Sequence, residues 1–113
     1  MDKALKYKKL AKKILRKYVD WDNEKPSLTV DYLLVADDSS GNYLWLNLGW
    51  TKNGRINKPT VHLRVRDEKI WIEEDWTEHG IANDFLEAGV PKEDIVLAFY
   101  APSDRVLTEF AAA

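Results

Sequence analysis

The sequence predicts an α+β domain with an antiparallel-rich sheet and its helices on one face. Three observations predict this class. Residues 3–19 repeat apolar positions at helical spacing, residues 28–72 alternate apolar and polar positions between turn signals, and residues 77–100 combine a short helical pattern with an apolar run. The resulting element order is α-β-β-β-β-α-β, which is typical of α+β domains. At 113 residues, we expect one domain spanning residues 1–113.

Composition narrows the class of protein further. The chain has 17 basic and 19 acidic residues, a net charge of −2, 45% hydrophobic residues and no cysteine. The lack of cysteine excludes disulfides, thiolate-ligated zinc and thiol catalysis, and it is compatible with a reducing compartment. No apolar run approaches the length of a membrane span, and no apolar stretch typical of a signal peptide follows the basic amino terminus. We therefore expect a cytoplasmic protein with no membrane contact.

The first element, residues 3–19, is predicted to be an amphipathic helix with a basic outer half. Its apolar side chains share one helical face: Tyr7, Leu10, Ala11, Ile14, Leu15 and Tyr18. The opposite half holds cations and no acid: Lys6, Lys8, Lys9, Lys12, Lys13, Arg16 and Lys17. We expect Asp22, Asn23 and Pro26 to end this helix.

Four strands are predicted next, at residues 28–36, 43–50, 61–66 and 70–73. Turn-forming residues at 37–42 separate the first two strands, a loop at 53–59 ends at Pro59, and Asp67-Glu68 links the last two strands as a hairpin. The apolar positions of each strand have the alternating period of a sheet with one buried face.

Parity along these strands predicts a surface for a protein partner. If Leu44, Leu46 and Leu48 face the helices, the alternate residues of that strand face away from them. The same argument applied to the later strands gives an outer face made of Tyr43, Trp45, His62, Arg64 and Trp71. Because Trp, Tyr and Arg are enriched at interface hot spots, we expect these residues to bind a partner. The alternative is that the aromatics pack against the carboxyl-terminal tail or against Leu33 and Val35.

A second helix and a last strand complete the expected fold. Thr77 is the predicted N-cap, and Gly89 suits the left-handed position that follows a helix. The helix would bury Ile81, Ala82, Phe85 and Leu86. Residues 95–100 are continuously apolar and predict a strand buried on both faces. The tail from Pro102 has no clear pattern.

Signals for catalysis are weak. The serines lie in predicted turns, and no Gly-x-Ser-x-Gly motif is present. Asp75, Glu78 and His79 could hold a divalent ion, but acidic residues are also favoured at helix amino termini. Asp67-Glu68-Lys69 matches the acid-x-Lys element of some nucleases, yet it falls at a predicted turn. We therefore expect a non-enzyme with no catalytic residue, cofactor or metal site.

The basic helix has three open interpretations. Its cations could form a solvated face, contact an acidic protein partner or second copy, or neutralise nucleic-acid phosphates. The candidate contact residues are Lys9, Lys12, Lys13 and Arg16.

Several motifs between residues 43 and 110 resemble one family. They are Leu48-Gly49-Trp50, Gly54-Arg55, Val61-His62-Leu63, Lys69-Ile70-Trp71-Ile72, the run from Asp75 to Ala82, and the run from Leu86 to Phe99. This pattern resembles the cyanobacterial fdxN-element excision controlling factor XisI family. The amino-terminal helix and the chain length also fit, so the resemblance covers nearly the whole chain.

The resemblance implies a small cytosolic accessory protein with no established catalytic activity. Members are associated with the excision of a DNA element by a site-specific recombinase, and they typically accompany a second protein, XisH, which resembles restriction-endonuclease-type folds. We expect a regulatory protein that acts with an XisH-type partner and forms a homo-oligomer such as a dimer. The alternative is a small nucleic-acid-binding protein that uses the basic helix.

Overall fold

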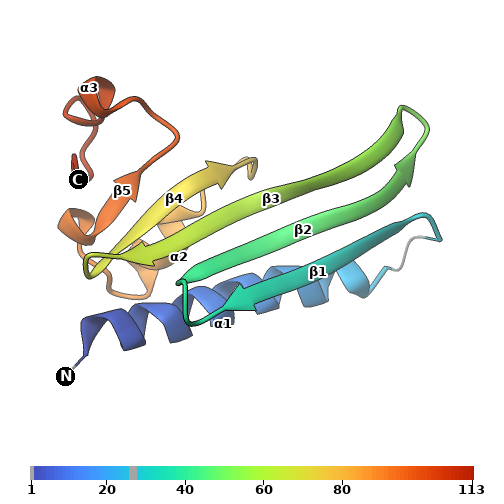
Figure 1. Cartoon of the computed structure of the whole chain (residues 1–113), viewed down its shortest axis with the longest axis horizontal. Coiled ribbons are helices and arrows are strands. Elements are labelled where there is room, and N and C mark those ends of the chain that lie inside the picture. The colour runs from blue at the N-terminus through green and yellow to red at the C-terminus, as the bar shows by residue number, and fades with distance from the viewer. Residues whose placement is uncertain (1, 26–27) are drawn as a thin grey trace.

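A helix of 21 residues packs across one face of a five-stranded sheet in the computed structural model, which describes residues 2–25 and 28–113 (Figure 1). The helices are α1 (Lys3–Asn23), α2 (Ala82–Glu87), the 3-10 turn η1 (Lys92–Asp94) and α3 (Pro102–Arg105). The strands are β1 (Val30–Asp37), β2 (Asn42–Thr51), β3 (Gly54–Arg66), β4 (Lys69–Asp75) and β5 (Ile95–Leu97). The predicted fold class is confirmed, and the predicted order of elements is extended by η1 and α3.

The long helix α1 begins where Asp2 caps it and ends at Asn23. The Asp2 carboxylate accepts a hydrogen bond from the Ala4 amide at 3.0 Å. The predicted apolar face is buried, but the helix continues four residues beyond position 19. Asp22 and Asn23 extend it because each binds the sheet: Trp45 Nε1 donates to Asp22 at 2.9 Å, and Asn23 donates to the Tyr32 carbonyl at 3.0 Å. Pro26, predicted to help end the helix, lies outside the described residues.

The sheet runs in the order β1-β2-β3-β4-β5, antiparallel except between β4 and β5. The predicted loop at 53–59 is wrong, because β3 already begins at Gly54 and forms a long hairpin with β2. Pro59 lies opposite Leu46, beside a register shift, which is a position where a strand tolerates proline. The hairpin at Asp67-Glu68 is confirmed, and both residues have positive φ angles, 55° and 59°.

The second helix starts later than predicted. Thr77 is not its N-cap, since α2 begins at Ala82. Instead, the Asp75 carboxylate organises residues 77–81 by accepting hydrogen bonds from the Thr77 amide at 2.9 Å, the Thr77 hydroxyl at 2.6 Å and the Ile81 amide at 2.8 Å. The expected left-handed glycine after this helix is confirmed, with Gly89 at φ 93°. Ile81 and Phe85 are fully buried in the same core cluster as the α1 side chains.

The last strand is shorter than predicted. β5 ends at Leu97, and the Tyr100 amide bonds to the Leu97 carbonyl, which turns the chain away from the sheet. Ile95 and Val96 are fully buried, as expected for a strand covered on both faces, whereas Phe99 and Tyr100 are exposed. The chain then forms α3 and returns to the edge of the sheet, where Val96 and Ala111 make a parallel bridge.

A buried carboxylate ties the start of α1 to η1. Asp94 is 7% exposed, pairs with Lys3 at 2.8 Å and accepts a hydrogen bond from the Tyr7 hydroxyl. Burial acts to raise the pKa of Asp94, but the hydrogen bonds from Lys3 and Tyr7 outweigh it and leave that pKa below its ordinary value. The hydrogen bond between Tyr7 and Asp94 joins residues that are 87 positions apart in the sequence.

Truncating Trp45 tests the packing of α1 on the sheet. The Trp45 ring is 9% exposed and stacks on Tyr18, with centroids 5.3 Å apart and an interplanar angle of 7°. Trp45→Ala should therefore lower the free energy of unfolding by about 3–5 kcal/mol, as measured by urea denaturation. The control Trp50→Ala removes a ring that is 59% exposed and should cost much less. Equal losses in both variants would contradict the packing described here.

Asp94→Asn tests the buried carboxylate. Because folding lowers the Asp94 pKa, the charged group stabilises the fold above its unfolded pKa of about 4 and loses that contribution as the pH falls through its folded pKa. The variant should be less stable by about 2 kcal/mol at pH 7. Urea denaturation across pH should show this deficit shrinking below about pH 4. The exposed Asp31→Asn is the control, and a deficit independent of pH would contradict the prediction.

Candidate docking surfaces

The face of the sheet turned away from α1, called here the outer face, holds an exposed group of aliphatic side chains. Leu33 pairs with Leu46 and Val35 with Leu44 in the antiparallel register of β1 and β2, so these side chains share one face. Leu33 and Val35 are 40% and 41% exposed, and the leucines of β2 are half-buried. We call this set the aliphatic patch: Leu33, Val35, Leu44, Leu46 and Leu48. Contiguous exposed apolar surface of this kind marks interaction sites.

The prediction that Tyr43 and Trp45 face outward is wrong. Tyr43 is fully buried on the α1 side of the sheet, where its hydroxyl donates to Asp38 at 2.7 Å. Trp45 lies beneath α1 against Tyr18. The leucines expected to face the helices are therefore the residues that form the outer face. A partner that binds the outer face meets aliphatic side chains in place of these two aromatic rings.

His62 and Arg64 do lie on the outer face, as predicted. Their partners in the register are Leu44 and Trp71, both outer-face residues. Burial, together with the charge of Arg64, lowers the pKa of His62 against the opposing effect of nearby carboxylates. The His62 ring is therefore neutral at pH 7, with Nε2 at 2.8 Å from the Asn42 side-chain oxygen.

Trp71 faces outward but is only 6% exposed, because the carboxyl-terminal segment covers it. The guanidinium groups of Arg66 and Arg105 lie 4.3 and 5.7 Å from its ring centroid. Arg105 is held over the ring by hydrogen bonds to the carbonyls of Ala98 and Tyr100. Trp71 therefore lies in a packed contact with the tail, which was the alternative interpretation of the sequence.

The basic face of α1 is largely paired with the protein's own acceptors. Lys12 forms an ion pair with Asp38 at 2.8 Å, and Arg16 lies 3.7 Å from Asp20. Three further cations have partners: Lys3 with Asp94, Lys8 with the Asp38 carbonyl, and Lys17 with the Tyr18 ring. Among the described residues, the α1 cations without such a partner are Lys6, Lys9 and Lys13. Two of the four predicted contact residues are thus engaged, and Lys6 joins the remaining two.

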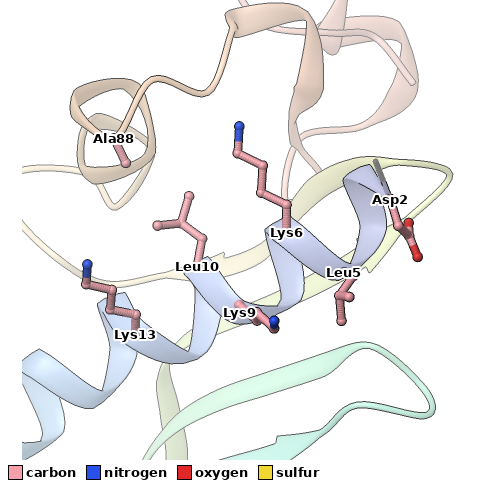
Figure 2. A pocket seen from close by; sticks show the side chains of 7 residues that line it. All are labelled: Asp2, Leu5, Lys6, Lys9, Leu10, Lys13 and Ala88. Carbon is pink, nitrogen blue, oxygen red and sulfur yellow. The ribbon is translucent and has the colours of Figure 1, made fainter.

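These three lysines surround one hollow, which we call the α1–α2 groove. It has a volume of about 410 Å³ and is lined by Asp2, Leu5, Lys6, Lys9, Leu10, Lys13 and Ala88 (Figure 2). A neighbouring hollow of about 470 Å³ shares Leu10, Lys13 and Ala88 and adds Ile14, Lys17, Asp84 and Glu87. The shared residues make the two hollows one surface that follows α1.

The possible metal ligands Asp75, Glu78 and His79 do not form a common metal site in the described residues. Both Asp75 carboxylate oxygens accept hydrogen bonds from residues 77 and 81, as described above. His79 Nε2 lies 3.0 Å from Asp84 and 3.3 Å from the Tyr18 hydroxyl, which also donates to Asp84. Burial, and then this bond to Asp84, raises the pKa of Tyr18 to about 12. Within residues 2–25 and 28–113, no group of three potential ligands is placed to hold a metal ion.

The acid-x-Lys sequence lies in the β3–β4 turn. Asp67 and Glu68 occupy the two turn positions, and Lys69 opens β4. Asp67 is committed to an ion pair with Arg66 at 3.5 Å. Among the described residues, no group of three potential metal ligands forms at this turn, so the geometry does not resemble a two-strand magnesium site.

No helix in the described chain has both the length and the apolar composition needed to cross a membrane.

Comparisons with known proteins agree with this architecture. The sequence matches the XisI protein family over residues 1–112. A XisI-like protein from Anabaena variabilis has a similar structure, with 34% identity, a TM-score of 0.90 and coverage of 97% of this chain and 99% of that one. The fdxN element excision controlling factor XisI from the same organism has 42% identity, a TM-score of 0.85 and coverage of 99% and 100%. No protein with a curated description gives a significant match. This chain belongs to the XisI family.

Proposed function

We propose that this chain is a non-enzymatic accessory protein in the control of DNA element excision, and that it acts by binding a protein partner in the cytoplasm. The observation that carries the proposal is the exposed aliphatic patch on a chain aligned end to end with a fdxN element excision controlling factor. A regulator needs a specific binding surface, and the patch provides one. The non-enzymatic role is supported by Asp75, whose two carboxylate oxygens serve to order the loop before α2.

The aliphatic patch suits a broad, flat partner surface. It extends along β2 to Trp50, which is 59% exposed and has the Arg55 guanidinium 5.6 Å from its ring centroid. Aromatic and arginine side chains supply much of the binding energy at interfaces once a partner buries them. β1 is an edge strand of the sheet, so its open side adjoins the patch. A partner of the XisH type would bury the patch.

The basic face of α1 does not assist this contact. α1 packs on the face of the sheet opposite to the patch (Figure 1). A partner surface that binds the aliphatic patch therefore does not contact the lysines of α1. The outer face of the sheet and the basic face of α1 are thus two separate surfaces.

A second copy of the chain is the other protein that could cover the patch. Apolar surface on one face of a sheet favours face-to-face association between identical subunits. The oligomeric state of the chain alone and with the XisH-type partner distinguishes these two occupants.

A nucleic-acid-binding function is the alternative, and the observation that favours it is the group of α1 lysines that have no partner in the described part of the chain. Lys6, Lys9 and Lys13 could contact consecutive phosphates. Binding of this type would fall steeply with salt and would be lost on charge reversal at Lys9 and Lys13. A labelled DNA duplex, titrated at two salt concentrations, measures this directly.

The partner proposal predicts a stoichiometric complex that needs the aliphatic patch. Co-expression with an XisH-type protein, followed by light scattering, should give a hetero-complex that survives moderate salt because apolar contacts hold it. Leu33→Gln combined with Val35→Thr should weaken that complex at least about tenfold. Both positions are about two-fifths exposed, so the fold should be retained.

Trp21→Gln is the matched control, since Trp21 is 61% exposed on α1, on the opposite side of the sheet. It should leave the complex intact. If the chain does not bind the partner at either low or moderate salt, the proposed function is overturned. A complex unaffected by the β1 double variant would overturn the patch as its docking site.

A further inference from the structure

We propose that the α1–α2 groove is a second docking site, which binds an acidic segment of a partner protein through carboxylates and apolar side chains. This site is separate from the aliphatic patch and lies on the opposite side of the sheet. Its occupant is inferred from two properties of the groove: an aliphatic floor, and a rim of three lysines that have no ion-pair partner among the described residues.

The floor of the groove is aliphatic. Leu5 is 50% exposed, whereas most of the other apolar residues of α1 face the core. Leu10 is half-buried, and Figure 2 shows it pointing toward Ala88, across the groove. A leucine left half-exposed beside a hollow offers apolar area that a bound side chain can cover, at about 25 cal/mol for each Å² removed from water.

The rim is positively charged. Figure 2 shows Lys6 and Lys13 on either side of Leu10, and Lys9 on the neighbouring side of the helix. Residues four positions apart on a helix are neighbours, so Lys9 and Lys13 form one row with Leu5, and Lys6 forms a second row with Leu10. The other α1 cations have partners of their own. The uncompensated charge of this helix is therefore concentrated at the groove.

Among the described residues, the other charged side chain that lines the groove, Asp2, forms no ion pair with these lysines. Asp2 lies at one end of the groove, where its carboxylate caps α1 through the Ala4 amide. At the other end, Asp84 and Glu87 line the neighbouring hollow. Because Asp84 and Glu87 repel carboxylates, the acidic part of a bound segment should lie at the end that holds Lys6, Lys9 and Lys13.

These features favour a protein segment over nucleic acid. Single-stranded bases stack on aromatic side chains, and no aromatic residue lines either hollow. Phosphate contacts need no leucine floor, and Asp84 and Glu87 would repel a backbone that continued along the groove. An acidic amphipathic helix, in contrast, presents both carboxylates and apolar side chains along one face. The groove and the neighbouring hollow together follow α1 from Asp2 to Lys17, a length of roughly 22 Å, which matches about four helical turns.

The test uses a synthetic, end-blocked peptide of roughly four helical turns, with leucine on one face and glutamate beside it. The full chain, labelled with nitrogen-15, is titrated with this peptide, and amide shifts locate the site. A scrambled peptide of the same composition, with the leucine face dispersed, is the second probe. A DNA duplex of similar net charge is the third.

We expect the amphipathic peptide to shift amides of residues 2–17 and of Ala88, and to bind more tightly than the scrambled peptide. Lys9→Glu combined with Lys13→Glu should weaken binding at least about tenfold, and Leu5→Gln at least about threefold. The matched control, Lys25→Glu combined with Lys52→Glu, makes the same change in net charge at exposed sites outside the groove. It should change the affinity less than about twofold.

Three results would overturn the proposal. They are no binding at millimolar peptide, shifts confined to the outer face, and equal binding of the amphipathic and scrambled peptides. Tighter binding of the duplex, insensitive to Leu5→Gln, would assign the lysines to nucleic acid instead. Shifts confined to the outer face would point to the aliphatic patch, and the other outcomes do not involve it, so the experiment tests the two docking sites separately.

Discussion

The packing of α1 against the inner face of the sheet is the contact on which the rest of this structure depends. Tyr7, Leu15 and Val19 are almost fully buried there, together with Tyr43 and Leu63 from the strands. Once this face is inside, the period of two along each strand decides which residues face the opposite side. The same contact turns the basic half of α1 toward solvent. The aliphatic patch and the α1–α2 groove are therefore both consequences of one packing arrangement.

Much of the fold follows from local pattern. The helical period of α1 and the alternation in β1 and β2 are long enough to predict each element. The errors arise where a single distant or polar contact outweighs propensity. Pro59 suggests a loop, but a register shift accommodates it within β3. Thr77 has the chemistry of an N-cap, but the Asp75 carboxylate orders the loop and delays α2 to Ala82.

The faces of β2 show why the candidate site was harder to predict than the fold. Both faces of this strand carry large apolar side chains, leucines on one and Tyr43 and Trp45 on the other, so its sequence does not show which face is buried. The stacking of Trp45 on Tyr18 decides the matter, and it joins residues far apart in sequence. The pairing of Lys12 with Asp38 is equally non-local, at a separation of 26 residues. Single-sequence patterns predict the cations of α1 but not which of them are already neutralised.

The position of the aliphatic patch beside β1 also bears on the behaviour of the chain in concentrated solution. β1 ends the sheet, so one of its sides has no neighbouring strand. An open strand edge next to exposed leucine and valine is a template for pairing with further copies. Asp31 and Asp37, at either end of this strand, oppose such growth by charge repulsion. Hydrogen bonds from Ser40 and Ser39 hold the pKa of the Asp37 carboxyl below its usual range, so this end of the strand keeps its negative charge in mildly acidic solution.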